Sequence, residues 1–227
     1  ISKENFTDET LQRLQLTQTE ILDEVVRVCD KFGLKYYLAE GTLLGAVRHK
    51  GFIPWDDDLD IAMPREDFDR FAELWQQELS DKYYFQFVNT FDNHYLPFAK
   101  VRKKNTLLNE YNIRNLDVPK GIYIDVFPLD NFKKESISFK IRTRIIKIIA
   151  FPITAKLGIE HKNSFLHKTV LVLLKPFSIK TLNKFRNKLM TYDNKQKTDY
   201  YVNFASYYNV KKQIFKNSDY GFGTKLE

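Results

Sequence analysis

The spacing of hydrophobic residues predicts a long helix at the start of the chain, followed by a short strand. From Thr7 to Phe32, apolar side chains recur every three or four residues, which places them on one face of a helix. Gly33 follows at once and can adopt the left-handed backbone that ends many helices. The next apolar run, Lys35 to Ala39, is short and is expected to form a strand.

The same reasoning predicts a second long helix and several further strands. Pro64 suits the first position of a helix that runs to about Leu79. Helices alternating with strands and followed by more strands indicate an α+β fold, a mixed sheet flanked by helices. The further strands are expected at Tyr83 to Val88, Leu96 to Arg102, Thr106 to Leu108 and Gly121 to Phe127.

The chain changes character near Asn131 to Ser136 and becomes basic beyond it. Its formal net charge is +7, and the stretch from Ser136 to Met190 contains twelve Lys or Arg with a single acid, Glu160. We therefore expect residues 1–132 to form a catalytic core. Residues 133–227 are expected to form a basic, helix-rich region that completes the domain.

Two stretches of this basic region mix lysines and arginines with apolar residues at helical spacing. They run from Phe139 to Ile149 and from Leu166 to Leu174. Such helices can lie on an anionic membrane surface, or they can pack on the core and expose their lysines to water. Nucleic acid is a third partner and ranks last, because no nucleic-acid recognition motif accompanies the charge.

Cysteine usage and hydropathy indicate a cytoplasmic protein. The single cysteine, Cys29, allows no disulfide within the chain and is expected to be buried as a small apolar residue. No signal peptide or membrane-spanning run is visible in the sequence. Contact with the inner face of the plasma membrane would then be peripheral.

Four acids in five residues, at Asp56, Asp57, Asp58 and Asp60, form the densest cluster of charge. From Asp58 to Met63 the acids alternate with apolar residues, which predicts a strand with Asp58 and Asp60 on one face. Carboxylates this close raise each other's pKa unless a cation, Mg²⁺ or Mn²⁺, neutralises them. The alternative is a solvated acidic turn.

Residues before this cluster are candidates for binding phosphate. Gly41 and Thr42 follow a predicted strand and open a short helix, whose first backbone amides could hold a phosphate, although glycine at such a turn is often plain backbone geometry. Arg48 and His49 lie between this turn and the acids. Trp55 could stack on a base or a quaternary ammonium but is better explained as a core residue.

A third carboxylate is expected on a later strand. Asp125 alternates with the apolar residues around it, so it needs a partner, which a metal ion, a lysine or an arginine could supply. Asp130 is explained well by a simple turn. Lys100 and Arg102 share one face of a predicted strand, and both could reach a diphosphate.

These features together resemble a known fold and, more narrowly, a known family. The Gly-Thr turn, the Asp-x-Asp strand and the third carboxylate resemble the nucleotidyltransferase fold of DNA polymerase β. The segments EGTLLG from Glu40, IPWDDDLD from Ile53 and IDVFPLD from Ile124 look like the motifs of the LicD family, over roughly residues 11 to 132. The family also carries a C-terminal Tyr-Gly-Asp and Pro-Pro signature, which this sequence lacks up to Glu227.

The resemblance implies a metal-dependent transferase that uses a nucleotide-activated donor such as CDP-choline. It implies that phosphocholine is joined to a sugar hydroxyl of teichoic acid, capsule or lipopolysaccharide, with release of CMP. Asp58 and Asp60 would hold Mg²⁺, and Asp125 would complete the metal site and help to deprotonate the acceptor. Transfer of a nucleoside monophosphate with release of pyrophosphate, or a non-catalytic membrane- or glycan-binding role, stays an alternative.

Overall fold

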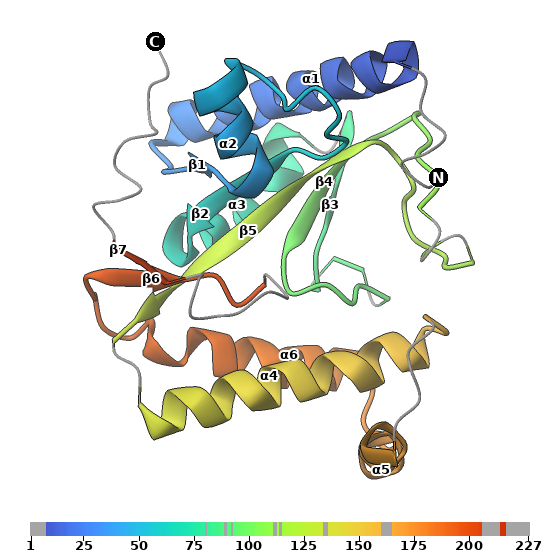
Figure 1. The fold of residues 1–227 in the computed structure, drawn as a ribbon, viewed down its shortest axis with the longest axis vertical. Helices are drawn as coiled ribbons and strands as arrows, with labels where there is room; N and C mark the ends of the chain where they lie inside the picture. The colour runs from blue at the N-terminus through green and yellow to red at the C-terminus, as the bar shows by residue number, and fades with distance from the viewer. Residues whose placement is uncertain are drawn as a thin grey trace.

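The computed structural model describes residues 8–79, 81–88, 90–91, 93–110, 113, 115–133, 136–159, 165–205 and 214–216 (Figure 1). The helices are α1 (Asp8–Phe32), α2 (Glu40–His49), α3 (Arg65–Glu78), α4 (Ile137–Lys156), α5 (Phe165–Leu174) and α6 (Ile179–Met190), followed by a 3₁₀ turn, η3 (Thr191–Asp193). The strands are β1 (Tyr37–Leu38), β2 (Asp60–Pro64), β3 (Tyr83–Gln86), β4 (Ala99–Lys103), β5 (Tyr123–Phe132), β6 (Tyr200–Val202) and β7 (Ile214–Lys216).

The strands form one mixed sheet, which confirms the predicted α+β class. Its order is β1-β2-β5-β4-β3, with β2 and β5 parallel and the other neighbours antiparallel. The last three residues of β5 pair with β6, which in turn pairs with β7. Residues on both sides of the expected boundary near Asn131 therefore share one sheet.

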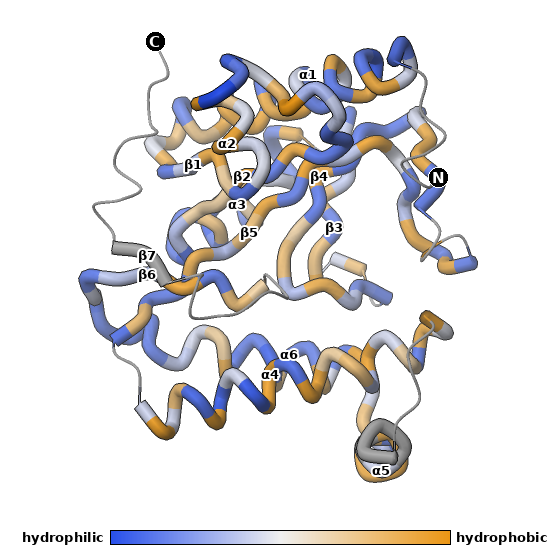
Figure 2. The backbone as a smooth tube through the Cα atoms, in the orientation of Figure 1, coloured by the Kyte–Doolittle hydropathy of each residue, from blue (hydrophilic) through white to orange (hydrophobic). Residues whose placement is uncertain are grey.

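Helices α1 and α3 cover one face of this sheet. The apolar positions of α1 alternate with polar ones (Figure 2), and Ile21 and Val25 are fully buried against the strands. Cys29 is buried in the same core, as predicted. Because side chains alternate along a strand, Ile61 and Ile124 face this core. Their neighbours Asp60 and Asp125 lie on the other face, where the candidate site is found.

Helices α4 and α6 pack against each other below the sheet (Figure 1). Polar contacts attach α6 to the segment before β4: Asn183 Nδ2 donates to the His94 carbonyl at 2.8 Å, and Arg186 Nη1 donates to the Tyr95 carbonyl at 2.9 Å. Sequence periodicity did not predict α6, β6 or β7. Thr7, the side chains of Leu166 and Val170, and the C-terminal residues from 217 onward lie outside the described residues.

Several predicted boundaries are wrong. Residues 106–108 form no strand, because Thr106 Oγ1 instead accepts a hydrogen bond from the Ile122 amide and holds an irregular loop. Pro64 ends β2 and precedes α3, so it is not the first helical residue. β5 continues past Phe127 to Phe132, because β6 supplies pairing partners that local sequence does not reveal.

Candidate functional site

The acidic residues lie on a loop that returns along α2. Close packing requires glycine at position 45, where a Cβ would lie 2.6 Å from the Gly51 carbonyl oxygen. Gly41 lies against the Asp56 side chain, since a Cβ there would be 2.8 Å from Asp56 Oδ2. The first turn of α2 therefore contacts the carboxylate cluster directly. The predicted short helix after a strand is confirmed, but Gly41 and Thr42 lie inside the first turn of α2 and form no separate turn before it.

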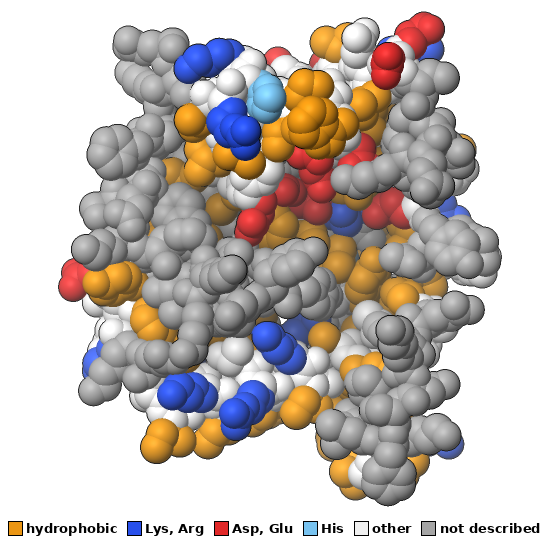
Figure 3. Space-filling model, viewed as in Figure 1, with side chains coloured by type: hydrophobic (Ala, Val, Ile, Leu, Met, Phe, Trp, Pro, Cys, Tyr) orange, Lys and Arg blue, Asp and Glu red, His pale blue; other side chains and the backbone are white. Residues whose placement is uncertain are grey.

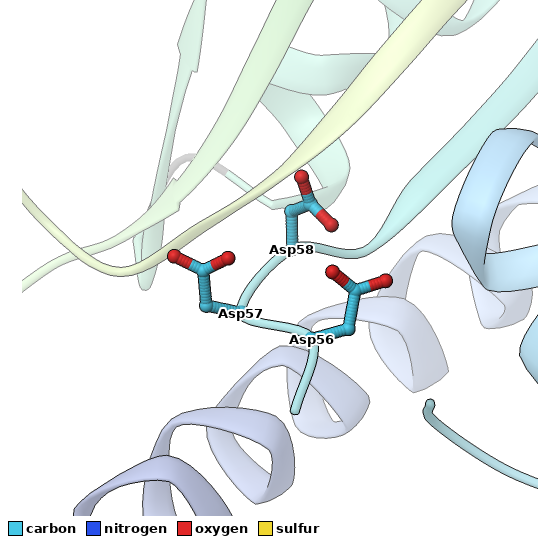
Figure 4. A group of neighbouring side chains, drawn as sticks. All are labelled: Asp56, Asp57 and Asp58. Carbon is cyan, nitrogen blue, oxygen red and sulfur yellow. The ribbon is translucent and has the colours of Figure 1, made fainter. Parts of the chain in front are cut away.

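Asp56, Asp57 and Asp58 form a compact group of oxygen donors. One ligand atom from each lies within 4.8 Å of the other two, the one such acidic group among the described residues. Their carboxylates rise from the same side of the loop (Figure 4), and acidic side chains gather in the upper half of the face drawn in Figure 3. Asp58 precedes β2 and does not belong to it, which corrects the strand predicted from Asp58.

Two glutamines of α1 donate hydrogen bonds to the backbone of this loop, and neither was predicted from the sequence. Gln15 Nε2 donates to the Asp56 carbonyl at 2.9 Å, and Gln18 Nε2 donates to the Asp57 carbonyl at 3.0 Å and to the Tyr123 carbonyl at 3.2 Å. Gln18 is completely buried. A polar residue on the apolar stripe of α1 was the signal that could have found it.

Asp60, Asp125 and Lys100 form a row across three neighbouring strands. In the strand register Asp60 of β2 is opposite Asp125 of β5, and Asp125 is opposite Lys100 of β4. Lys100 Nζ lies 2.7 Å from Asp125 Oδ1 and 3.4 Å from the ring centre of Tyr123. Asp125 therefore has the cationic partner that its buried position requires.

Burial raises the pKa of both carboxyl groups in this row. Burial, then the charges of Asp125 and Asp58, raise the pKa of Asp60 to about 8, and Lys100 opposes part of this effect. Burial also raises the pKa of Asp125, against the opposing charge and hydrogen bond of Lys100. The site thus concentrates more negative charge than its own lysine balances, which favours binding of a cation.

The hydroxyl of Thr42 has a structural partner. Thr42 Oγ1 accepts a hydrogen bond from the Asp60 amide at 2.8 Å, so it ties the start of α2 to the start of β2. Gly41 and Thr42 lie in the first helical turn, whose amides lack intrahelical acceptors. This turn and the carboxylates of the loop are consequently held at a fixed spacing.

The four predicted cations lie in different surroundings. Arg48 and His49 are exposed in the last turn of α2. Arg102 is buried and donates to Gln86 Oε1, to the Gly121 carbonyl and to Glu110 Oε1, so its guanidinium is committed to protein groups. Lys100 lies on the same face of β4 but beside Asp125. Of the four, Lys100 is therefore the one in direct contact with a candidate carboxylate.

Trp55 is not a core residue, which corrects the expectation from sequence. Its side chain is 73 % exposed, and its ring lies 6.3 Å from the His49 ring in an edge-on arrangement. The loop must leave α2 and turn toward β2, and this path directs Trp55 outward beside the three carboxylates. An exposed indole next to an acidic cluster is suited to stacking on a ligand.

Asp130 does not lie in the predicted turn but forms a buried ion pair within a strand. It lies inside β5, has no exposed surface, and accepts from Arg65 Nε at 2.8 Å and Arg65 Nη2 at 3.0 Å. Asn194 Nδ2 also donates to Asp130 Oδ1 at 2.7 Å. These contacts join β5 to the start of α3 and to the segment after α6.

The comparison with known proteins agrees with this geometry. Residues 33–144 match the family described as "LicD/FKTN/FKRP, nucleotidyltransferase domain". The lipopolysaccharide cholinephosphotransferase LicD of Haemophilus influenzae is 30% identical over 178 residues, which cover 77% of this chain and 66% of that protein. The human ribitol 5-phosphate transferase FKRP is 44% identical over 50 residues, which cover 22% of this chain and 10% of FKRP.

An uncharacterised protein of Rickettsia typhi is 39% identical over 66 residues, which cover 29% of this chain and 21% of that protein. The chain thus spans about two thirds of the length of the Haemophilus protein and far less of the other two. The matched residues 33–144 contain α2, the acidic loop, β2, β4 and β5, which are the elements that build the site. The chain belongs to the LicD family.

Proposed function

We propose that this protein is a metal-dependent transferase that moves phosphocholine from CDP-choline to a sugar hydroxyl and releases CMP. The observation that carries the proposal is the row of Asp60, Asp125 and Lys100 across β2, β5 and β4, with Asp56, Asp57 and Asp58 beside it. The similarity to a cholinephosphotransferase supports choline as the transferred alcohol. The acceptor would be a glycan of teichoic acid, capsule or lipopolysaccharide.

The oxygen donors of the site fit a hard divalent cation. Carboxylates are the ligands that Mg²⁺ and Mn²⁺ prefer, and the excess negative charge would be neutralised on binding. The three carboxylates whose oxygens lie within 4.8 Å of one another are Asp56, Asp57 and Asp58, a group that does not include Asp60 or Asp125. We propose Asp58 and Asp60 as ligands, with Asp125, which is opposite Asp60 in the strand register, as the third and Asp56 or Asp57 as further donors. When bound, the ion would offset the charge of the donor diphosphate and of its leaving group.

The residues of the chain would then orient the two substrates. The first turn of α2, with Gly41 and Thr42, would hold the donor phosphates, Lys100 and Arg48 would supply positive charge, and His49 would offer a hydrogen bond from the last turn of α2. Arg102 would act indirectly, by holding Tyr123 and Gln86 in place.

The sugar hydroxyl would attack the phosphorus that carries choline while the bond from that phosphorus to the CMP oxygen breaks. Asp125 would accept the hydroxyl proton, for which its raised pKa suits it.

The protein would work on the inner side of the plasma membrane, with residues 136–190 as a peripheral contact. None of the helices in the described part of the chain is both long and apolar enough to cross a bilayer.

Release of CMP from a panel of CDP-alcohols tests the reaction. The wild-type protein is expected to release CMP from CDP-choline at a slow, Mg²⁺-dependent rate and faster with a glycan acceptor. Release of pyrophosphate from a nucleoside triphosphate, with none of CMP, would instead support nucleotidyl transfer. Calorimetry that detected no metal-dependent binding of any donor would support the non-catalytic alternative.

Trp55 is expected to recognise the donor by stacking on its base or its quaternary ammonium. Trp55→Ala should raise the KM for the donor by about tenfold, since such contacts contribute about 1–2 kcal/mol, while kcat changes less. Trp55→Phe should retain most of the affinity. The melting temperature should hardly change, because the indole is 73 % exposed. A lower melting temperature with an unchanged KM would contradict this role.

A further inference from the structure

Helix α4 has two hydrophobic faces, and only one of them is buried. Phe139, Ile146 and Ile149 pack against α6 and the neighbouring strands. On the opposite side, Ile137, Ile141 and Ile148 are between 43 % and 79 % exposed. Positions four and eleven residues after Ile137 fall on the same side of a helix, so the three isoleucines form a line. A helix that merely covered a core would present polar residues there.

Helix α5 adds further exposed apolar residues beside α4. Val172 and Leu173 are 72 % and 68 % exposed, whereas Leu174 packs against Ile149, Ile153 and Leu182 and fixes the end of α5 beside α4. Figure 3 shows hydrophobic side chains along the lower edge of the molecule, over α4 and α5. We call Ile137, Ile141, Ile148, Val172 and Leu173 the apolar ridge.

Positive charge surrounds the ridge without any acid among the helices that build it. Arg144 lies on the line of isoleucines, and Lys140 and Lys147 flank it, all three exposed. The sequences of α4, α5 and α6 contain no Asp or Glu. A nucleic-acid backbone would neutralise these charges but would leave the isoleucines in water. An anionic lipid surface satisfies both features, because it accepts apolar side chains below its headgroups.

We propose that the apolar ridge docks this protein on an anionic lipid bilayer. The inference makes the peripheral contact proposed above specific, and it does not depend on the chemistry of the transfer. In Figure 1, α2 lies in the upper part of the molecule and α4 lies along its lower edge, with the strands between them. Docking through α4 would therefore leave the carboxylate site open to a water-soluble donor while the protein stays close to a membrane-bound acceptor.

Flotation with vesicles tests this surface. The full chain is expected to float with vesicles of phosphatidylglycerol and phosphatidylcholine, and not with phosphatidylcholine alone. Replacing Ile137, Ile141 and Ile148 together by glutamine should weaken binding by roughly tenfold or more. Replacing Lys140, Arg144 and Lys147 together by glutamine should weaken it by roughly a hundredfold, about fivefold for each charge, and salt should have a similar effect.

Leu16→Gln is the matched control, because Leu16 is 66 % exposed on α1, away from the ridge, and this variant should bind like the wild type. Donor cleavage without vesicles should be unchanged in the ridge variants, so failure of the transferase proposal and failure of this one can be told apart. Absence of flotation would overturn the proposal. So would binding that the lysine and arginine replacements abolish but the isoleucine replacements leave intact, since that pattern indicates a general polyanion surface such as one for DNA.

Discussion

Asp60→Asn is expected to abolish metal-dependent release of CMP while the protein stays folded. Asp60 is buried opposite Asp125 and near Asp58. Water therefore cannot easily take the place of its carboxylate as a metal ligand. Loss of one charged ligand at a preorganised site should lower kcat by roughly a thousandfold or more. CMP release under saturating donor and Mg²⁺ measures the loss, and circular dichroism confirms the fold.

The same substitution should change how stability depends on pH. Without metal, burial and the neighbouring acids raise the pKa of Asp60 to about 8, from an ordinary value of 3.8. Between these values the folded protein keeps a proton that the unfolded chain has lost, so the free energy of unfolding falls as pH rises. In EDTA, urea unfolding of the wild type should lose a few kcal/mol across this range, and Asp60→Asn should lose much less.

Asp81→Asn controls for the removal of one negative charge, because Asp81 is exposed at the turn before β3. It should retain wild-type activity and wild-type pH dependence. Mg²⁺ should raise the melting temperature of the wild type near neutral pH and leave that of Asp60→Asn nearly unchanged. An Asp60→Asn variant that turned over normally would remove Asp60 from the catalytic site. One that failed to fold would assign it a structural role.

Local pattern was sufficient to predict the elements that carry the site. The apolar spacing of α1, the glycine at the start of α2 and the alternation around Asp125 are each visible in local sequence. The shared face of Lys100 and Arg102 also follows from strand periodicity. Local pattern could not show that Lys100 and Arg102 have different contact partners. The register of β4 with β5 places Lys100 opposite Asp125, whereas Arg102 contacts Gln86 of β3 and Glu110 of the loop after β4.

The predictions that failed depended on distant parts of the chain. Trp55 was expected in the core because it is large and aromatic, yet the path of its loop leaves it in water. Gln15 and Gln18, which were missed, are some forty residues from the Asp56 and Asp57 carbonyls, and Gln18 is 105 residues from the Tyr123 carbonyl. Asp130 was read as a turn because its partners, Arg65 and Asn194, are each more than sixty residues away. No local window contains such contacts.

Asp130→Asn is expected to destabilise the protein strongly and to leave its chemistry intact. The carboxylate has no exposed surface and holds both Arg65 Nε and Nη2, so an amide in its place would leave the buried guanidinium with only the exposed carboxylate of Asp69, at 3.8 Å, as a countercharge. Breaking one side of a buried ion pair typically reduces the free energy of unfolding by about 3–5 kcal/mol. Urea unfolding followed by circular dichroism measures this change.

Asp69→Asn is the matched control, since Asp69 also approaches Arg65, at 3.8 Å, but its side chain is 61 % exposed and should contribute less than about 1 kcal/mol. Asp125→Asn, in the same strand, is expected to have the opposite effect: it should remove activity. At low temperature, where both variants stay folded, Asp130→Asn should release CMP at nearly the wild-type rate per folded molecule, and Asp125→Asn should release almost none. If Asp130→Asn were stable and inactive, Asp130 would belong to the reaction, and the structural role derived from its contacts with Arg65 and Asn194 would be wrong.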